Sequence, residues 1–426
     1  MPLIKNRKML ATSDSRRDAL DIFEAGLEAI DTTRVINSQV NLKGSKLKIG
    51  KTILNLDNYR NIFVIGIGKA SFDAAKALEK IMGNRITDGL ILDVKGGVLK
   101  RMKSVIGTHP LPSLPNMKAT GEIIALLKHV DSRDLVLAIV SGGGSALLCW
   151  PYEMNCEELA AVTQTLMHGG ATIEELNIVR KHLSEILGGQ FARLAHPARI
   201  VSLIFSDVAD DDLSVIASGP TVLDLTTISD ARKILDKYDV LKICRLPNCQ
   251  LLETPKDPIY FKDVTNILLV NNQVATKAMM AKARELGYRA KIYSTQLVGE
   301  ASEVGKLMAN LPKPGEAYIA AGETTVTVHG HGRGGRNQEL ALGALSVITD
   351  GQLVASMASD GIDNGPAAGA LVDYTLQLKA KKLGLKPATY LKNNNSFAFF
   401  NKVGGQIVVG QTGANVSDLM IALRAR

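Results

Sequence analysis

The chain has 426 residues, of which 46% are hydrophobic and 22% are charged, and its formal net charge is +8 at pH 7. This length predicts two or three globular domains. The longest apolar runs are far shorter than the roughly 18–20 residues that cross a bilayer, so we expect no membrane span. No apolar segment typical of a signal peptide follows the first residues, which predicts a cytoplasmic protein.

The charge and the cysteines exclude two further classes of protein. The 50 basic and 42 acidic residues form no long block of one sign, so nucleic-acid binding is not expected. A small anionic substrate suits the same mild basic excess. Neither a zinc site nor a disulfide framework is predicted. The cysteines lack CxxC spacing and are Cys149, Cys156, Cys244 and Cys249.

The first 240 residues alternate helices and strands. The apolar spacing predicts helices over residues 15–31, 70–81, 116–129, 156–169 and 174–194, and strands over 61–68, 88–94, 135–140 and 198–207. Several of these strands end in Gly, Ser or Asp. The pattern predicts a Rossmann-like, mainly parallel α/β/α sheet, with a ligand crevice at the carboxyl ends of its strands.

A stretch rich in proline and polar residues then interrupts the alternation. We expect a larger Rossmann-like domain over 1–240, a linker over 241–263 and a smaller α/β domain over 264–426. The predicted elements of the second domain are strands over 266–270, 289–293, 325–328, 353–358 and 406–410, and helices over 273–286, 301–311, 337–348 and 415–426.

The stretch Gly322–Glu339, GETTVTVHGHGRGGRNQE, combines three features that bind anions. Four glycines between positions 330 and 335 let a ligand approach main-chain N–H groups. The guanidinium groups of Arg333 and Arg336 can bind phosphate or carboxylate oxygens. The predicted helix after Asn337 adds free N–H donors. We interpret the stretch as a binding site for a phosphate or carboxylate group. The alternative interpretation is a flexible hairpin whose arginines are solvated.

A second glycine-containing loop, Gly66-Ile67-Gly68-Lys69-Ala70-Ser71, follows the first strand of the predicted parallel sheet. It lacks the Walker A spacing and half-matches the dinucleotide fingerprint, with Asp93 near the position of a ribose-binding acid. A nicotinamide-dependent oxidoreductase is therefore one hypothesis. The Lys69 ammonium instead suits charge on a transferring phosphoryl group.

The loop Ser141–Ser145 also follows a buried strand, and its three glycines, Gly142, Gly143 and Gly144, favour phosphate cradling. Ser145 lies at a strand-to-helix turn, but the surrounding sequence lacks the GxSxG pattern of a hydrolase nucleophile. Asp207 ends the next strand and is followed by the acidic run 210–212. Such carboxylates can hold Mg²⁺ or act as a base toward a hydroxyl.

Other candidates lie on single elements. Arg180, with Asn177 and Lys181 at helical spacing, either faces a ligand or forms a solvated helix face. Glu323 and Asp360 supply the second domain with acids. A Lys, glycines and an Asp in one domain, with arginines and acids in the other, match the division of a kinase site between two domains.

Seven motifs, taken in order, give the chain a resemblance to the MOFRL-type glycerate 2-kinase family. They are GIGKAS, THPLP, VSGGGSALL, LNIVRKHLSEILGGQFARLA, SDVADDDLSVIASGPT, GETTVTVHGHGRGGRNQE and SDGIDNGPAAGALVD. The chain departs from the family at Asp210, Leu213 and Pro366. The resemblance implies a two-domain α/β enzyme that uses ATP and Mg²⁺ to convert D-glycerate to 2-phosphoglycerate in a cleft between its domains.

The resemblance places Lys69, Asp207, Arg336 and Asp360 around the active site. We expect Lys69, Asp207 and Arg336 to be catalytic, and glycerate to contact Arg336, Arg333, Arg180 and Ser145. The nucleotide is expected at Gly66, Gly68, Lys69 and Gly142–Ser145, and the metal at Asp207, Asp211 and Asp360. The oligomeric state is expected to be a monomer or a homodimer. The alternatives are an NAD(P)-dependent hydroxypyruvate reductase and an anion-binding protein without turnover.

Overall fold

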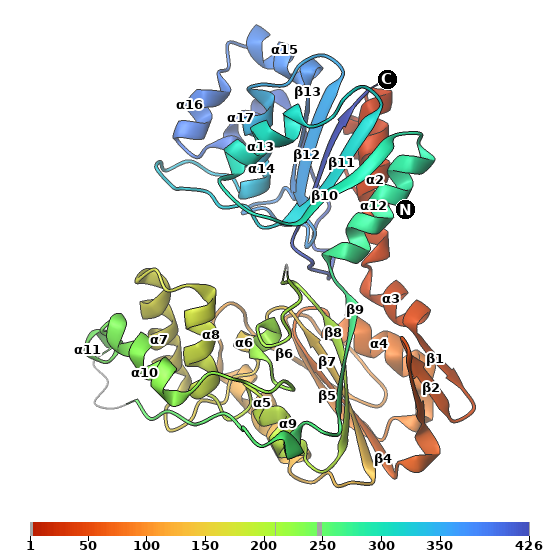
Figure 1. The fold of residues 1–426 in the computed structure, drawn as a ribbon, viewed down its shortest axis with the longest axis vertical. Helices are drawn as coiled ribbons and strands as arrows, with labels where there is room; N and C mark the ends of the chain where they lie inside the picture. The colour runs from red at the N-terminus through yellow and green to blue at the C-terminus, as the bar shows by residue number, and fades with distance from the viewer. Residues whose placement is uncertain (1–2, 209, 245–248, 426) are drawn as a thin grey trace. The chain divides into compact units, whose positions relative to one another are not determined.

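The computed structural model describes residues 3–208, 210–244 and 249–425. These residues form two compact units, shown in Figure 1 and treated separately below. The parallel-sheet unit is Val35–Leu269, and the mixed-sheet unit is Met1–Arg34 together with Val270–Arg426. No helix in the described ranges is both long and apolar enough to cross a membrane.

The units divide the chain differently from the boundaries expected at 240 and 264. The first 34 residues join the C-terminal unit because helix α2 (Asp14–Ala29) packs against helix α12 (Asn272–Glu285). Strand β9 (Val264–Val270), expected to open the second domain, lies instead at the edge of the parallel sheet.

The parallel-sheet unit is built on a six-stranded sheet in which β5 and β6 lie on one side of β4, and β7, β8 and β9 on the other. From β6 across to β8 all neighbouring strands are parallel, and β4 and β7 are in register from Asn61↔Asp134 to Ile67↔Val140. The strand order therefore reverses between β4 and β7, where doubly wound sheets bind ligands. The strands are β4 (Asn61–Ile67), β5 (Asp88–Asp93), β6 (Lys103–Ile106), β7 (Asp134–Ser141) and β8 (Arg199–Phe205).

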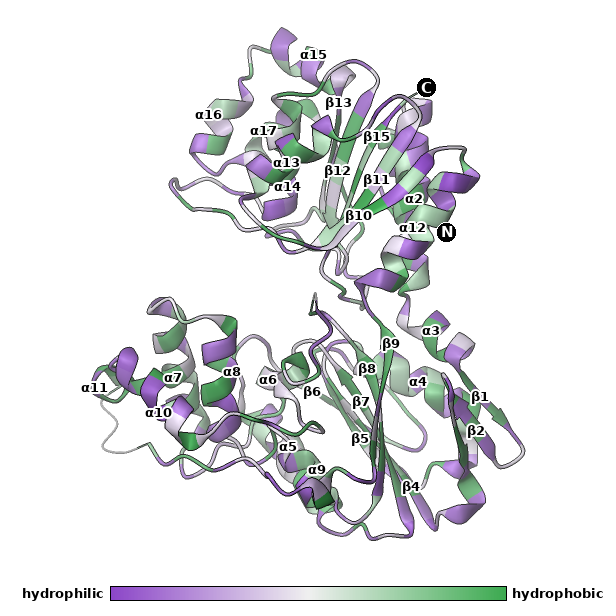
Figure 2. Cartoon of the chain, viewed as in Figure 1, coloured by the Kyte–Doolittle hydropathy of each residue, from purple (hydrophilic) through white to green (hydrophobic). Residues whose placement is uncertain are grey.

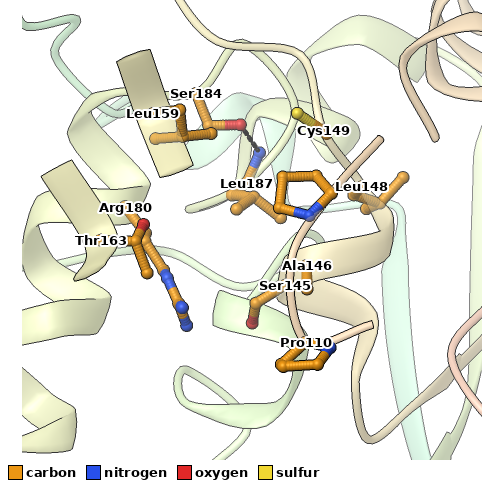
Figure 3. Close-up of a pocket in the computed structure, with 11 residues that line it drawn as sticks. Pro110, Ser145, Ala146, Leu148, Cys149, Leu159, Thr163, Arg180, Ser184 and Leu187 are labelled. Atoms are coloured by element: carbon orange, nitrogen blue, oxygen red, sulfur yellow. Dashed lines mark hydrogen bonds between the residues drawn. The ribbon is translucent and has the colours of Figure 1, made fainter. Parts of the chain in front are cut away.

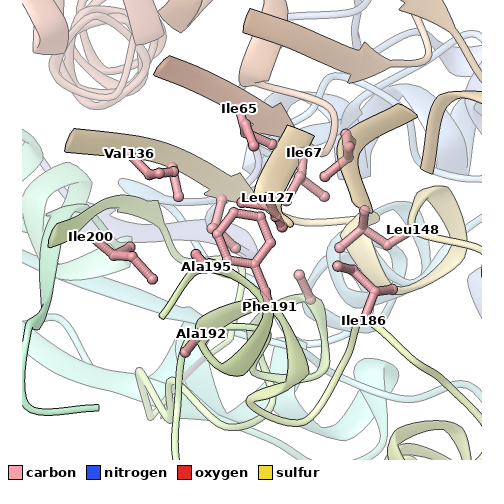
Figure 4. Packing of buried hydrophobic residues seen from close by; sticks show 14 of the residues in the cluster. Ile65, Ile67, Leu127, Val136, Leu148, Ile186, Phe191, Ala192, Ala195 and Ile200 are labelled. Atoms are coloured by element: carbon pink, nitrogen blue, oxygen red, sulfur yellow. The ribbon is translucent and has the colours of Figure 1, made fainter. Parts of the chain in front are cut away.

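Helices pack against this sheet. On one face, Phe191 of α9 (Gln190–Ala195) packs into a cluster with Ile65, Val136 and Ile200 (Figure 4). Helix α5 (Leu114–Leu127) extends the cluster, while α4 (Ser71–Met82) contacts β4, β5 and β7. Burial of each large side chain contributes about 1.5–3 kcal/mol. The strands are correspondingly hydrophobic along their lengths (Figure 2).

The predicted helix over 174–194 is wrong, because the structure has two helices there. Helix α8 (Ile173–His182) ends before Gly188 and Gly189, whose φ angles of 57° and 83° interrupt the helix before α9. A small antiparallel sheet was not predicted; its strands are β1 (Val40–Lys43), β2 (Lys46–Ile49) and β3 (Thr52–Asn55). The remaining helices are α3 (Thr32–Gln39), α6 (Gly144–Leu147), α7 (Cys156–His168), α10 (Ile228–Lys237) and α11 (Val240–Cys244).

The mixed-sheet unit has a second six-stranded sheet, in which β10 and β11 pair in parallel and the other neighbouring strands pair antiparallel. Helices α13 (Ala301–Asn310) and α14 (Arg336–Leu345) cover one face, and α2 and α12 contact the strands as well. The sheet order is β10 (Arg289–Leu297), β11 (Glu316–Gly322), β15 (Asp418–Arg424), β12 (Gln352–Ala358), β13 (Gly369–Asp373) and β14 (Gln406–Ile407).

The predicted C-terminal helix over 415–426 is also wrong. Residues 418–424 form strand β15, which lies between β11 and β12. Its residues from Asp418 to Leu423 are all buried, so the polar–apolar alternation that marks a half-exposed strand is absent. The other helices of this unit are α1 (Arg7–Leu10), α13 (Ala301–Asn310), α14 (Arg336–Leu345), α15 (Tyr374–Lys382), α16 (Pro387–Lys392) and α17 (Ser396–Val403).

Candidate functional site

The loops after β4 and β7 interlock at the point where the sheet order reverses. The Ser141 hydroxyl donates to the Ile67 carbonyl at 3.2 Å and accepts the Ala70 N–H at 3.1 Å. The Lys69 N–H donates to the Gly142 carbonyl at 3.0 Å. These bonds fix the Lys69 backbone beside the triple-glycine loop. The predicted proximity of the two loops is therefore observed.

Gly68 allows this close approach. Its φ angle is 108°, and a Cβ atom there would lie 2.4 Å from the Ser141 carbonyl oxygen. We expect Gly68→Ala to lower the free energy of unfolding by about 2–4 kcal/mol, from backbone strain together with the clash. Gly44→Ala is the matched control, since Gly44 has a φ of 61° and a Cβ atom there would meet no other described atom within 4 Å. It should cost only about 1 kcal/mol in urea unfolding; equal losses for the two variants would contradict the packing argument.

Side chains from three elements meet over the triple-glycine loop. A Cβ atom on Gly142 would lie 2.1 Å from Asp207 Oδ2, so the carboxylate at the end of β8 rests against this glycine. A Cβ atom on Gly143 would lie 3.1 Å from His109 Cδ2 and 3.2 Å from Lys69 Cε. The glycines thus make room for Asp207, Lys69 and His109, as well as for any ligand.

Lys69 and Arg180, the two cations of this site, form no ion pair with an acid among the described residues. Within residues 3–208, 210–244 and 249–425, no hydrogen bond or ion pair joins the side chain of Lys69 or Arg180 to another residue. Burial lowers the pKa of Arg180. Burial, then the charges of Lys69 and Arg180, lower the pKa of His109 to about 4, which keeps its ring neutral at pH 7. An anionic ligand would relieve the uncompensated charge.

A pocket adjoins Ser145 and Arg180, which Figure 3 shows with their polar ends in the same region. The Ser145 and Ser218 hydroxyl oxygens lie 2.8 Å apart. The pocket volume is about 20 Å³, little more than one water molecule. Its other lining residues are Pro110, Pro112, Ala146, Leu148, Cys149, Leu159, Thr163, Ser184 and Leu187.

The two basic residues that follow Arg180 on α8 have structural partners. Lys181 Nζ lies 3.2 Å from Asp224 Oδ1 in a buried ion pair, and His182 Nε2 lies 3.2 Å from Glu253 Oε1. Of these three basic residues, Arg180 is the one whose side chain has no hydrogen-bond or ion-pair partner in the described part of the chain, and it is available to a ligand. The sequence could not show which of Arg180 and Lys181 faces a ligand, because both are basic residues on one helix and the directions of their side chains are not visible in the sequence.

Asp93 does not occupy the role of a ribose-binding acid. Its side chain is fully buried and accepts the Phe72 N–H at 2.9 Å and the Val94 N–H at 2.6 Å. The carboxylate therefore caps the start of α4 and the turn after β5. This arrangement disfavours the dinucleotide-binding interpretation of the Gly66–Ser71 loop.

In the mixed-sheet unit, Arg336 is held by two acids. Its Nε and Nη2 atoms lie 2.6 and 3.2 Å from the two carboxylate oxygens of Asp418, and Nη1 bonds to Glu323. The Arg336 side chain is 34% exposed, whereas that of Asp418 is 1% exposed. Three of the five guanidinium N–H groups are thus used, which leaves two for a ligand.

The glycine-rich loop of this unit contacts protein where a ligand was expected. The predicted strand over 325–328 is wrong: only an isolated bridge joins Thr325 to Glu300. The His329 and Gly330 N–H groups donate to Asn394 Oδ1 at 2.7 and 3.0 Å. A Cβ atom on Gly332 would lie 2.4 Å from the carbonyl oxygen of the neighbouring asparagine, residue 393. These glycines admit the 393–395 turn.

The remaining predicted ligands have local contacts. The exposed Arg333 guanidinium lies 5.1 Å from the Phe397 ring centroid. Asp360 Oδ1 accepts the Ile362 N–H at 3.0 Å. Asp363 accepts N–H groups from the first turn of α14, which caps that helix. No group of three or more His, Cys, Asp or Glu side chains that could hold a metal ion is found in the described part of the chain.

Two family profiles and several known proteins match this chain. The profile of a domain of unknown function, DUF4147, matches residues 18–248, and that of the MOFRL family matches residues 316–418. The chain is 37% identical to a D-glycerate 2-kinase of Thermotoga maritima, over 95% of this chain and 97% of that protein. It is 35% identical to a glycerate 2-kinase of Pyrococcus horikoshii, over 95% and 98%. The crystal structure of a Thermotoga maritima glycerate kinase superposes with a TM-score of 0.84 and 34% identity, covering 96% of this chain and 99% of that one.

Proposed function

Because the chain belongs to the glycerate kinase family that combines the DUF4147 and MOFRL domains, we propose that it is a glycerate 2-kinase. The reaction transfers the terminal phosphoryl group of ATP to the C2 hydroxyl of D-glycerate. The O–P bond to ADP breaks, a bond from C2 oxygen to phosphorus forms, and the hydroxyl proton leaves to a base.

The observation that supports this function is the pair of cations at the carboxyl edge of the parallel sheet. Lys69 and Arg180 lie around the triple-glycine loop without an acidic partner among the described residues. ATP and glycerate are both anions and would supply the missing negative charge. Phosphoryl transfer depends on such positioning and charge neutralisation more than on covalent chemistry.

Each residue of the site has a proposed role. The Lys69 ammonium stabilises the charge of the transferring phosphoryl group, and the three glycines Gly142–Gly144 lie beside the nucleotide phosphates. Arg180 binds the glycerate carboxylate. Asp207 orients the C2 hydroxyl and takes its proton. In the mixed-sheet unit, considered by itself, Arg336 is held in place by two acids and is proposed to offer its two remaining N–H groups to an anion.

We propose that Mg²⁺ reaches the site on the nucleotide. A site with few protein ligands is typical of Mg²⁺, which keeps waters and binds substrate phosphates together with one or two carboxylates. Asp207, near the triple-glycine loop, and Asp211 are the proposed carboxylates of the parallel-sheet unit. Asp360 is a separate candidate carboxylate of the mixed-sheet unit. Bound there, the ion would neutralise phosphate charge.

We expect EDTA to abolish turnover and excess Mg²⁺ to restore it, measured as ADP release.

A coupled assay tests the proposed function. ADP should form only when ATP and D-glycerate are both present, and ³¹P NMR should show the product phosphate on O2. A reductase would instead oxidise NADH or NADPH with hydroxypyruvate. Nicotinamide oxidation without ADP release would refute the kinase. Binding of glycerate without turnover in either assay would indicate an anion-binding protein.

A further inference from the structure

A buried chain of hydrogen bonds runs from the pocket into the parallel-sheet unit. The Ser145 hydroxyl, which lines the pocket, lies 2.8 Å from the Ser218 hydroxyl. Ser218 in turn donates to Asn177 Oδ1 at 2.9 Å. The Ser218 and Asn177 side chains are both buried, at 0% and 5% exposure. The orientation of the Ser145 hydroxyl is therefore determined by buried residues of the protein.

The direction of this chain follows from the number of hydrogens. The Asn177 oxygen has none, so Ser218 must donate its single hydroxyl hydrogen there. Ser218 then has no hydrogen for Ser145, so the hydrogen between the two serines belongs to Ser145. The Ser145 oxygen consequently offers only lone pairs to the pocket.

The backbone holds Ser218 in this orientation. Residues Ala217, Ser218 and Gly219 have successive positive φ angles of 49°, 55° and 57°, and the side chains of the first two are buried. The Gly188 N–H bonds to the Ser218 carbonyl at 2.9 Å. Such a conformation costs free energy when it is adopted by residues other than glycine. The hydrogen bonds to Ser145 and Asn177 hold the Ser218 hydroxyl on this backbone before a ligand binds.

We propose that Ser145 is a specificity residue that accepts a hydrogen bond from the C3 hydroxyl of glycerate, with Asn177 and Ser218 as positioning residues. This inference rests on the proposed function. Arg180, in the same pocket lining, has only donors and suits the carboxylate. Asp207 is the acceptor assigned to the reacting C2 hydroxyl, so Ser145 serves the second hydroxyl. An acceptor-only Ser145 is unsuited to the phosphate role expected from the sequence.

Lactate gives the sharpest comparison, because it differs from glycerate in lacking the C3 hydroxyl. Bound lactate lacks the hydroxyl donor that the C3 group of glycerate would present to the Ser145 lone pairs. Sites built to bind a substrate hydroxyl discriminate against analogues without it. By titration calorimetry without ATP, the wild type should bind D-glycerate roughly 10–100-fold more tightly than D-lactate.

Variants separate this role from folding. Ser145→Ala should weaken glycerate binding and bring the lactate-to-glycerate Kd ratio to within about 3-fold of unity. Ser218→Ala releases the Ser145 hydrogen and should give an intermediate ratio. Asn177→Asp keeps an acceptor and should retain the wild-type ratio. Ser184→Ala is the matched control, since its hydroxyl lines the same pocket but accepts the Ile186 and Leu187 N–H groups.

The outcomes distinguish this inference from the proposed function. An unchanged Kd ratio in Ser145→Ala, or a ratio that collapses equally in Ser184→Ala, overturns it. So does a wild type that binds both acids equally or neither. A wild type that prefers glycerate in the calorimeter but transfers no phosphate refutes the kinase and leaves the role of Ser145 in hydroxyl recognition supported.

Discussion

Lys69→Ala is expected to lower the kcat for glycerate phosphorylation by roughly 10²–10³-fold, the usual cost of removing one charge-stabilising group. The fold should be unaffected. No side-chain hydrogen bond or ion pair of Lys69 is present among the described residues, so its loss leaves no buried acid unpaired there. The free energy of unfolding should stay within about 0.5 kcal/mol of the wild type in urea titrations.

Two variants make this result specific. Lys80→Ala removes an exposed lysine of α4 that forms no ion pair within the described ranges, and should change neither kcat nor stability. Lys69→Arg keeps the charge but replaces a compact ammonium with a wider guanidinium, so we expect partial activity. Turnover of Lys69→Ala near the wild-type rate would contradict the phosphoryl-stabilising role. A parallel loss of stability would show that the lysine is structural.

The positions of the site loops could be predicted from the sequence because they depend on strand order. Apolar runs that end in Gly, Ser or Asp mark buried parallel strands, and their carboxyl ends share one edge of the sheet. Lys69, Gly142 and Asp207 each follow such a run and lie together in the structure. The charge and spacing of these residues were sufficient to place them.

The partners of the second glycine-rich stretch could not be predicted in this way. A glycine that leaves space for a ligand cannot be distinguished in the sequence from one that leaves space for another backbone segment. At Gly332 that segment is the asparagine turn 393–395. Arg336 likewise binds Asp418, which lies 82 residues away on a strand that was predicted to be a helix. Because the strand was missed, its buried acid could not be recognised as a partner.

Arg336→Ala is therefore expected to destabilise the protein as well as reduce turnover. Removal of the guanidinium leaves Asp418, at 1% exposure, as a buried acid without its ion-pair partner. Breaking such a pair from one side costs about 3 kcal/mol in the free energy of unfolding. Arg336→Ala/Asp418→Asn removes both charges and should recover more than half of that loss in urea titrations at pH 8. Full stability of the single variant would contradict the ion pair.

The stability loss of Arg336→Ala should depend on pH, because it involves the titration of Asp418. Burial raises the pKa of Asp418 to about 6, although the Arg336 guanidinium opposes the rise. Without Arg336 the folded-state pKa rises further above the roughly 3.9 of the unfolded chain. The folded variant then binds its proton more tightly than the unfolded chain does, so its stability falls as pH increases from about 4 through the folded pKa. The deficit of Arg336→Ala should be largest at pH 8 and narrow toward pH 5. The double variant lacks this titration, so the extra fall in stability that Arg336→Ala shows between about pH 6 and pH 8 should be absent from it. Any turnover that the double variant has lost at pH 8 then reports the loss of the Arg336–Asp418 pair from catalysis apart from folding.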